Sequence, residues 1–430
     1  MAGTLLSIPE AILNLALQTP TYMLLLIFIL LIGLGLVTIF ITLHLIAPKP
    51  REPYPSEKTY ITTQPDGNVS LPRQLPCWYD RWRATSRLQE TSSSSSYSTI
   101  PPGFPVPQDD GLIEPAEVAI SVVIPAYNEA DRILPTLKEM VEYLDEKFGR
   151  PASAGQSRPS SSGATVKHHR LVFNKDKKER GDRGESGPLG GYEILVVNDG
   201  SKDSTVQVAL EFSKQNGLHD ILRVVTLEKN RGKGGGVTHG MRHVRGEYAI
   251  FADADGASRF SDLGKLIEGC EDVVDGSNRG VAIGSRAHLV GSEVVVKRSA
   301  IRNFLMRSFH FILMILTPPA TSRIRDTQCG FKLFSRAALP HIIPYMHSEG
   351  WIFDIEMLML AESAPATPVL ASDGSIIGTS CGIKVAEVPI QWHEVDGSKM
   401  NLVMDSIRMA IGLAVLRASW MMGVYRRRLS

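Results

Sequence analysis

The sequence predicts an α/β fold: a mostly parallel sheet with helices on both faces, one N-terminal transmembrane helix, and C-terminal interfacial helices. Three observations carry this prediction. From residue 118 onward, short β-branched apolar runs alternate with amphipathic segments, as in parallel sheets with crossover helices. Residues 22–46 form an unbroken apolar run. The polar segments PAYNE, NDGSKDS, EKNRGKGGG and DADGAS each follow a predicted strand directly.

Length and composition indicate a globular protein with one large domain or two ordinary ones. The chain has 430 residues, 43% of them hydrophobic, and a formal net charge of +1. Its four cysteines include no CxxC pair, which argues against a zinc site or disulfide framework and fits a reducing compartment. The densest basic charge lies in residues 167–183, a segment without hydrophobic periodicity. We therefore expect no nucleic-acid partner.

The apolar run at residues 22–46 carries no formal charge apart from a proton on His44. As a helix, about 25 residues extend roughly 37 Å, which exceeds a hydrocarbon core of about 30 Å. No basic segment precedes the run, and residues 48–51 (PKPR) follow it, which favours a signal-anchor over a cleaved signal peptide. Lys and Arg are absent from residues 1–21 and frequent after the helix. The positive-inside rule therefore places residues 1–21 in the lumen and the domain in the cytosol.

Composition divides the rest of the chain. Residues 47–116 are rich in Pro, Ser and charge and are interpreted as a tether, part of which can pack. Residues 117–401 form the main domain, in which 150–190 and 363–382 are predicted to be disordered insertions. Residues 402–430 are predicted to be a membrane-associated helix with a basic tail, and a second membrane span is the alternative.

The elements of the main domain follow from apolar periodicity. Strands are predicted at residues 118–124, 192–197, 222–227, 248–252 and 281–286, with an edge strand at 383–392. Helices are predicted at residues 131–148, 204–215, 235–244, 297–316 and 402–425. The segment 297–316 begins basic and continues apolar, which favours a helix lying in the membrane interface. Ligands bind at the carboxyl ends of parallel strands, so the polar segments are expected to converge there.

Asp253 and Asp255 follow the fourth predicted strand at positions i and i+2. Such a pair can share one hard cation, and Mg²⁺ or Mn²⁺ prefers a few protein oxygens plus substrate phosphates. A cation there would offset charge on a departing diphosphate. The motif is short, and taken alone it fits a pair of loop or capping acids better than a metal site; the motifs at the other strand ends favour the metal site.

Other strand ends carry complementary groups. Asp199 can accept a hydrogen bond from a base or ribose, and the serines after it can cap the next helix. The glycines around Lys233 allow backbone N–H groups to approach a phosphate, although a flexible loop is the alternative. Arg298 and Arg302 stand at i and i+4 on the predicted helix and project on one face. They suit an anionic ligand, and a basic stripe facing solvent or lipid is the alternative.

Seven motifs occur in order: PAYNEADRI, VVNDGSKDST, EKNRGKGGG, FADADGA, GSR, DTQCGFKLF and FDIEML. Together they resemble family-2 inverting glycosyltransferases with the Rossmann-like GT-A fold, and within that family the dolichyl-phosphate β-glucosyltransferases. The resemblance covers about residues 118–401, the expected catalytic domain. It implies transfer of glucose from UDP-glucose to dolichyl phosphate, with Mg²⁺ or Mn²⁺, for N-glycosylation at the endoplasmic reticulum membrane. The two insertions depart from the pattern, and Ala257 replaces a third polar residue found in some relatives, which leaves the rest of the metal shell open.

The resemblance also implies roles for individual residues. Those expected around the nucleotide are Pro125, Ala126, Tyr127, Glu129, Asp199, Lys233 and Asp253, with Asp255 as the principal metal ligand beside Asp253. Those expected to bind the acceptor phosphate and donor diphosphate are Arg286, Arg298 and Arg302. Those expected on the sugar side are Asp326, Gln328 and Asp354. Trp392 and His393 are expected to form a lid or acceptor edge.

The acceptor chemistry needs no general base. A phosphate monoester has a second pKa of about 6 and is largely ionised at neutral pH. In-line attack opposite an α-linked leaving group then gives a β-linked product. Two alternatives stay open: a dolichyl-phosphate mannosyltransferase using GDP-mannose, and a non-catalytic nucleotide-sugar-binding membrane protein. A processive synthase is disfavoured because the chain has no QxxRW motif. The identity of the metal and the oligomeric state also stay open.

Overall fold

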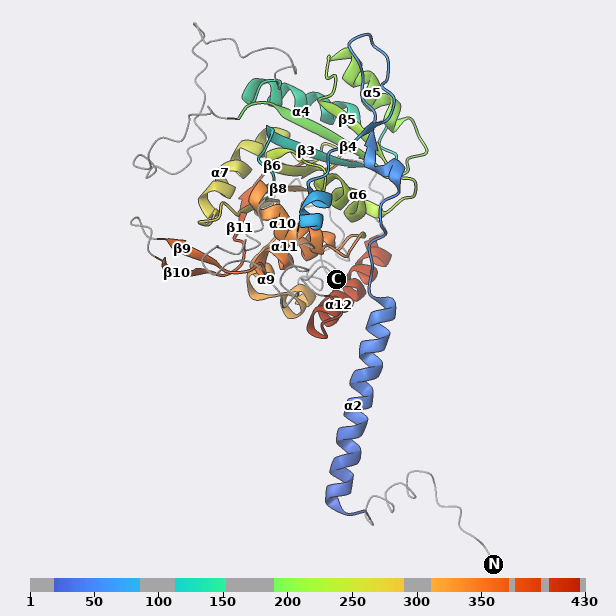
Figure 1. Ribbon diagram of the computed structural model, residues 1–430, viewed down its shortest axis with the longest axis vertical. Coiled ribbons are helices and arrows are strands. Elements are labelled where there is room, and N and C mark those ends of the chain that lie inside the picture. The colour runs from blue at the N-terminus through green and yellow to red at the C-terminus, as the bar shows by residue number, and fades with distance from the viewer. Residues whose placement is uncertain are drawn as a thin grey trace, which may run out of the picture. The chain divides into compact units, whose positions relative to one another are not determined.

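The computed structural model describes residues 19–85, 113–151, 189–289, 311–370, 376–395 and 402–425 (Figure 1). The chain divides into two compact units. One comprises Pro48–Leu413 with Arg428–Ser430, and the other comprises Met1–Ala47 with Ala414–Arg427. The larger unit contains the predicted sheet.

A seven-stranded sheet forms the centre of the larger unit, in the order β11-β7-β8-β6-β3-β4-β5. Its strands are β3 (Val118–Ala126), β4 (Tyr192–Asn198), β5 (Leu222–Thr226), β6 (Gly246–Ala252), β7 (Val281–Ser285), β8 (Phe331–Ser335) and β11 (Val385–Pro389). β3 pairs in parallel with β4 and β6, β4 with β5, and β11 with β7. β8 lies antiparallel between β6 and β7. The mostly parallel sheet and the edge position of the strand within 383–392 are therefore confirmed.

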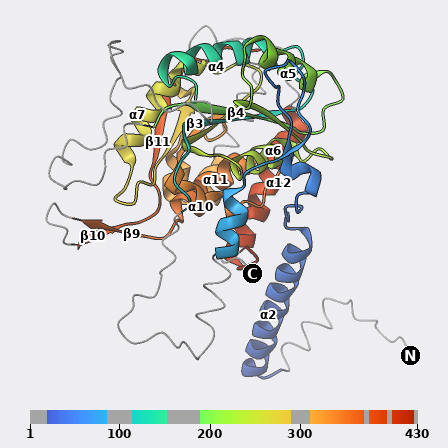
Figure 2. The same cartoon turned by 45° about the horizontal axis from the view of Figure 1, so that its top comes forward.

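Helices cover both faces of this sheet (Figure 2). Their bounds are α4 (Ile133–Lys147), α5 (Thr205–Gln215), α6 (Gly232–Met241), α7 (Leu263–Val273), α9 (Pro319–Arg323), α10 (Leu339–Ile342) and α11 (Phe353–Glu362). Apolar residues of α4, α5 and α7 share one core with the strands. On the opposite face, Gly240 of α6 packs against Val123 and Val197. The Phe353 ring of α11 is tilted against the Phe251 ring, with 5.7 Å between their centroids. Burial on both faces explains why the strands read as continuous apolar runs.

Two predicted segments differ from expectation. The insertion predicted to be disordered at 363–382 contains an antiparallel pair, β9 (Thr367–Leu370) with β10 (Ile376–Ser380). Its β-branched residues favour extended pairing, which corrects that part of the prediction. Of the predicted helix 297–316, the structure describes residues 311–316 as helical. Arg298 and Arg302 lie outside the described residues, as do positions 152–188 of the first insertion.

The first part of the predicted tether folds onto the sheet domain. It contains η1 (Pro55–Lys58) and the hairpin of β1 (Thr59–Tyr60) with β2 (Arg73–Gln74), and residues 78–85 are helical. Ile61 forms an antiparallel bridge to Val224 and so extends the sheet beyond β5. Trp78 is 2% exposed and donates its indole N–H to the Met241 carbonyl at 2.8 Å. These buried anchors show that this part of the predicted tether is packed, as the sequence analysis allowed. Residues 86–112 lie outside the described residues.

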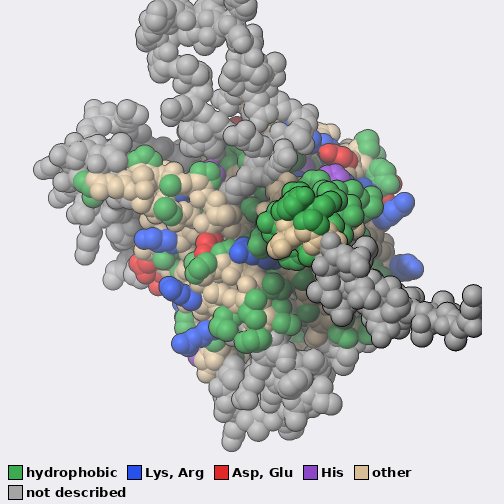
Figure 3. Space-filling model, turned by 90° about the horizontal axis from the view of Figure 1, so that it is seen from below, with side chains coloured by type: hydrophobic (Ala, Val, Ile, Leu, Met, Phe, Trp, Pro, Cys, Tyr) green, Lys and Arg blue, Asp and Glu red, His purple; other side chains and the backbone are tan. Residues whose placement is uncertain are grey.

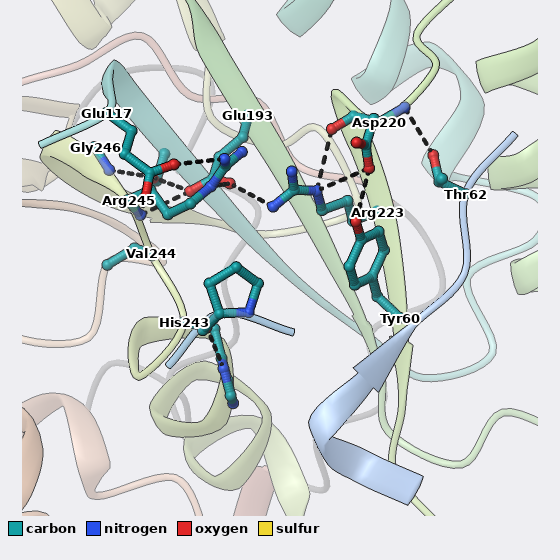
Figure 4. A network of polar contacts seen from close by, with 12 residues as sticks. Tyr60, Thr62, Glu117, Glu193, Asp220, Arg223, His243, Val244, Arg245 and Gly246 are labelled. Carbon is teal, nitrogen blue, oxygen red and sulfur yellow. Dashed lines mark hydrogen bonds and ion pairs between the residues drawn. The ribbon is translucent and has the colours of Figure 1, made fainter. Parts of the chain in front are cut away.

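A buried charge network ties together the amino-terminal parts of the strands (Figure 4). Glu193 on β4 is fully buried and lies 3.3 Å from Arg223 on β5 and 2.8 Å from Arg245 before β6. The hydroxyl of Ser121 on β3 donates to the same carboxylate at 2.6 Å. A buried charge persists only when it is paired and hydrogen-bonded, and Glu193 meets both conditions. These polar groups satisfy one another, so we assign the network a structural role.

The smaller unit contains α2 (Thr21–Ile46), a helix of 26 residues. At about 1.5 Å per residue it is roughly 39 Å long. Among the described residues it is the one helix long and apolar enough to cross a membrane. The hydrophobic side chains of α2 are mostly exposed (Figure 3). The predicted C-terminal helix is also present, as α12 (Leu402–Met421).

Candidate active site

The polar segments that follow β3 and β4 interlock. The two strands are paired in parallel up to Ala126 and Asn198, so their carboxyl ends lie at the same edge of the sheet. Beyond this point, Asp199 N donates to the Ala126 carbonyl at 2.8 Å, and Asn128 N donates to the Ser201 hydroxyl at 2.9 Å. The convergence that the sequence predicts is present for PAYNE and NDGSKDS.

Around Pro125, the residues expected at the nucleotide differ in exposure. Ala126 is buried, and Tyr127 is 36% exposed. Glu129 forms an ion pair with Arg132, 2.7 Å between Oε2 and Nη2, at the start of α4. Tyr127 is therefore the residue of this segment with the most side-chain surface for a ligand, whereas Glu129 organises the turn into α4.

Asp199 connects β4 to the glycine-rich loop that precedes α6. Its Oδ1 accepts the backbone N–H of Arg231 at 2.6 Å, and its backbone carbonyl accepts Asn230 Nδ2 at 3.0 Å. Burial raises the pKa of Asp199 to about 6, against the opposing effect of the backbone N–H groups of Arg231 and Gly232. The ionised carboxylate is a candidate for accepting a ligand N–H, because it is a stronger acceptor than the protonated acid.

Lys233 and the DAD motif meet at the end of β6. Lys233 Nζ lies 2.6 Å from Asp253 Oδ1, and the Asp253 backbone N–H donates to the Gly330 carbonyl at 3.2 Å. A Cβ at position 330 would overlap the Asp253 carboxylate, so only glycine fits there. Burial lowers the pKa of Lys233, but Asp253, Asp354 and Asp255 raise it overall, which keeps the ammonium charged.

The pair of acids fits a divalent cation that is shared with a substrate. Asp255 is half-buried, and its Oδ1 accepts the Ala257 N–H at 3.0 Å, which orients the carboxylate. Within the described residues, no group of three His, Cys, Asp or Glu side chains is arranged to hold a metal ion. Mg²⁺ usually takes one or two protein carboxylates together with substrate phosphates. Asp253 and Asp255 provide that number.

Arg286 is held by a fork of two parallel hydrogen bonds. Its Nε and Nη2 donate to the two oxygens of Asp326 at 2.7 and 2.8 Å. Burial lowers the pKa of Arg286, but Asp326 raises it overall. The guanidinium also lies over the Trp392 ring, 5.6 Å from its centroid. Asp326 therefore positions Arg286, and the sugar contact that the resemblance implies for Asp326 stays a prediction.

The segment with Trp392 and His393 lies beside the loop after β6. Trp392 forms an isolated antiparallel bridge with Ser258, and His393 N donates to the Ala257 carbonyl at 3.0 Å. The contact between Trp392 and Arg286 adds a second connection to the same region. This placement fits the expectation of a segment bordering the site.

Asp354 and Gln328 face protein groups. Asp354, in the first turn of α11, is 3% exposed and forms an ion pair with Lys332 of β8, which is completely buried. Lys332 also donates to the Cys329 carbonyl at 2.6 Å. Gln328 Nε2 lies 3.0 Å from Met409 Sδ on α12. In the structure Asp354 is therefore paired with Lys332, and its expected place on the sugar side stays a prediction.

Comparisons with known proteins agree with this geometry. A family model described as Glycosyl transferase family 2 matches residues 183–342. A dolichyl-phosphate beta-glucosyltransferase of Saccharomyces cerevisiae is 38% identical over 407 residues, covering 93% of this chain and 94% of that protein. The chain belongs to the dolichyl-phosphate β-glucosyltransferase family. The Homo sapiens protein of the same name is 35% identical over 308 residues, covering 71% of this chain and 77% of that protein.

A solved structure that matches this chain is glucosyl-3-phosphoglycerate synthase from Mycobacterium tuberculosis in complex with UDP. It is 15% identical, with a TM-score of 0.41, and covers 71% of this chain and 80% of that chain.

Membership of the dolichyl-phosphate β-glucosyltransferase family confirms the resemblance drawn from the seven motifs and the GT-A-type α/β fold. It also makes the chain an enzyme of the glycosyltransferase type and disfavours the mannosyltransferase and non-catalytic alternatives.

Three residues of this glucosyltransferase-family site have no role in the sequence prediction. Lys332 lies in the quoted motif DTQCGFKLF, and a lysine inside an apolar strand is itself a signal of a buried partner. Arg231 lies in EKNRGKGGG and joins Asp199 to Glu349, 2.8 Å between Arg231 Nε and Glu349 Oε1. Glu57 lies in the predicted tether, where composition gives no indication of it.

Proposed function

We propose that the chain transfers glucose from UDP-glucose to dolichyl phosphate with inversion, giving dolichyl β-D-glucosyl phosphate. The observation that carries the proposal is 38% identity to a dolichyl-phosphate beta-glucosyltransferase over 93% of the chain. The local geometry supports it: Asp199, at the end of β4, accepts the backbone N–H of Arg231, and two residues later Lys233 pairs with Asp253 at the end of β6. The carboxyl edge of a parallel sheet is where nucleotide ligands bind in α/β folds.

The residues of the site are proposed to contribute to catalysis in two ways, by positioning the substrates and by stabilising charge. The acceptor phosphate is its own nucleophile, so no side chain has to remove a proton. Lys233 carries positive charge toward the diphosphate, beside the two acids of the DAD motif. Mg²⁺ or Mn²⁺ held by Asp253 and Asp255 would neutralise charge on the departing UDP. Arg286, fixed by Asp326, supplies an oriented guanidinium for the anionic groups.

The membrane placement rests on α2 and its flanks. Its length and apolar surface support a single span, and the charge asymmetry around it supports a cytosolic domain at the endoplasmic reticulum membrane. A lipid-borne acceptor would then share the bilayer with the enzyme. Dolichyl phosphate and the lipid bilayer are accordingly the proposed partners.

A direct test uses purified full-length protein in detergent with dolichyl phosphate and radiolabelled UDP-glucose, GDP-mannose or UDP-GlcNAc in parallel reactions. We expect label in the lipid fraction with UDP-glucose and a divalent cation. Transfer from GDP-mannose alone would replace the proposed donor, and no transfer from any donor would contradict the enzymatic proposal.

Arg298 is predicted to bind the acceptor phosphate. Arg298→Ala is expected to raise the KM for dolichyl phosphate about tenfold, because one charge-assisted contact to phosphate is lost. The KM for UDP-glucose should change by less than about twofold. Steady-state kinetics with each substrate varied in turn check this, and an unchanged acceptor KM would contradict the assignment.

Donor binding is expected to weaken as the pH falls through about 6, because the ionised Asp199 accepts a base N–H more strongly than the protonated acid does. With that pKa, the KM for UDP-glucose should rise about tenfold between pH 7 and pH 5. Asp199→Asn keeps an acceptor oxygen but does not titrate, so its donor KM should be higher at pH 7 and flat across this range. A wild-type profile as flat as that of the variant would contradict the role.

Asp199 affects the folding stability of the unliganded protein in the opposite direction: donor affinity falls as the pH is lowered, whereas its contribution to stability rises. The pKa of Asp199 is raised on folding from 3.8 to about 6, so the native state binds more protons between these values. Its contribution to stability therefore increases as the pH falls through the window. A loss of donor affinity at pH 5 is thus separable from unfolding caused by Asp199.

A further inference from the structure

Residues 51–57, which we name the juxtamembrane strap, lie against the loop between β5 and α6. Their anchor is Glu57, whose side chain is fully buried. The carboxylate accepts two backbone N–H groups, from Tyr54 and from Glu228, each at 2.9 Å. It also pairs with Arg51 Nη2 at 2.6 Å. One buried charge therefore joins both ends of the strap to the first residue of the EKNRGKGGG loop.

The strap makes two more contacts on the same side. Arg231 Nη2 donates to the Arg51 carbonyl at 3.0 Å. His239, in the last turn of α6, has its Nε2 2.8 Å from the Glu57 carbonyl, so Nε2–H donates to it. The strap thus holds the loop before α6 and the helix itself, while Trp78 holds the far end of α6 through Met241.

These contacts lead directly to the groups assigned to the donor. The backbone N–H of Arg231, whose side chain reaches the strap, donates to Asp199. Two residues later, Lys233 reaches Asp253. A shift of the loop would therefore move the Asp199 contact and the Lys233 ammonium together. Because a shift of about 1 Å at a reacting centre can cost a hundredfold in rate, the strap is well placed to affect the donor site.

We propose that the juxtamembrane strap is a positioning element of the donor site, with Glu57 holding the loop from Glu228 to Gly235 in its binding conformation. The proposal rests on the proposed function, since it assigns the strap to the binding of the nucleotide sugar. Glu57 touches no substrate and acts through Glu228, Arg231 and His239. The segment that follows the membrane helix is then part of the enzyme's donor site as well as its connection to the membrane.

The test variant is Glu57→Gln in the full-length protein, purified in detergent. We expect the dissociation constant for UDP, measured by calorimetry, and the KM for UDP-glucose to rise about tenfold, as for loss of a buried charge-assisted contact. The KM for dolichyl phosphate should stay within twofold. Arg51→Met is a milder second variant, because it leaves the backbone contacts of Glu57 in place, and it should raise the donor KM about threefold.

Thr62→Val is the matched control. Thr62 is buried in the segment that follows the strap, and its hydroxyl donates to the Leu222 carbonyl at 2.7 Å, at the opposite end of β5 from Glu228. This variant should lower the melting temperature without changing the UDP dissociation constant. A folded Glu57→Gln protein with wild-type UDP affinity would overturn the strap's role, as would equal losses in donor and acceptor parameters. Absence of UDP binding by the wild type would instead overturn the proposed function, and the strap's role with it.

Discussion

Replacing Asp255 with asparagine is expected to lower glucosyl transfer by about two to three orders of magnitude while leaving the protein folded. The carboxylate is half-buried in the loop after β6, and its one described hydrogen bond, from the Ala257 N–H, can also be accepted by an amide oxygen. The local fold therefore does not need the charge. The reaction does, because an amide is a weaker ligand for Mg²⁺ and the departing diphosphate then loses its electrostatic stabilisation.

Initial rates with purified protein over a series of Mg²⁺ concentrations measure this effect. The variant should need more Mg²⁺ for half-maximal rate and should have a far lower maximal rate. Glu268→Gln, which changes an exposed acid on α7, is the control and should match the wild type. Near-normal turnover of Asp255→Asn at ordinary Mg²⁺ concentration would remove the metal role of this residue.

The sequence predicts most of the sheet because each of those strands carries its own signal. Val118–Ala126 and Tyr192–Asn198 are apolar runs that end in polar segments, and the structure places those segments in contact. β8 is missed for a local and a nonlocal reason. Lys332 interrupts its apolar run, and its antiparallel position depends on pairing with β6 and β7. Nonlocal pairing leaves little trace in a short window of sequence.

The contacts of the strap and the ion pairs of the site also join residues that are far apart in the sequence. Proline and charge around Glu57 are typical of a linker, and its burial depends on the loop at Glu228, 171 residues later. Arg286 and Asp326 are 40 residues apart, so the motifs identify both as polar without identifying them as partners. Sequence reasoning therefore locates the site by its motifs, whereas the supporting contacts appear only in the folded chain.

Lys332→Met is expected to have the largest effect on stability. The substitution leaves Asp354 buried and without its cation, and breaking one side of a buried ion pair costs about 3–5 kcal/mol. Burial already raises the pKa of Asp354, against the effect of Lys332 and Lys233. In the variant, Asp354 would take up a proton more readily. The destabilisation should therefore shrink as the pH is lowered, because the native state then binds more protons than the unfolded state.

The double variant Lys332→Met/Asp354→Asn separates the structural from the catalytic role of this pair. Removing both charges should restore most of the lost stability, measured as the free energy of unfolding in urea, because no unpaired charge stays buried. Transfer should nevertheless remain at or below about a tenth of the wild-type rate, since Asp354 also contributes to the field that holds the Lys233 ammonium beside Asp253. Recovery of both stability and rate would make the pair purely structural. A decrease in the free energy of unfolding of less than about 1 kcal/mol in Lys332→Met would show that Asp354 is neutral in the native protein. The lysine can be removed at so small a cost only if its partner carries no charge.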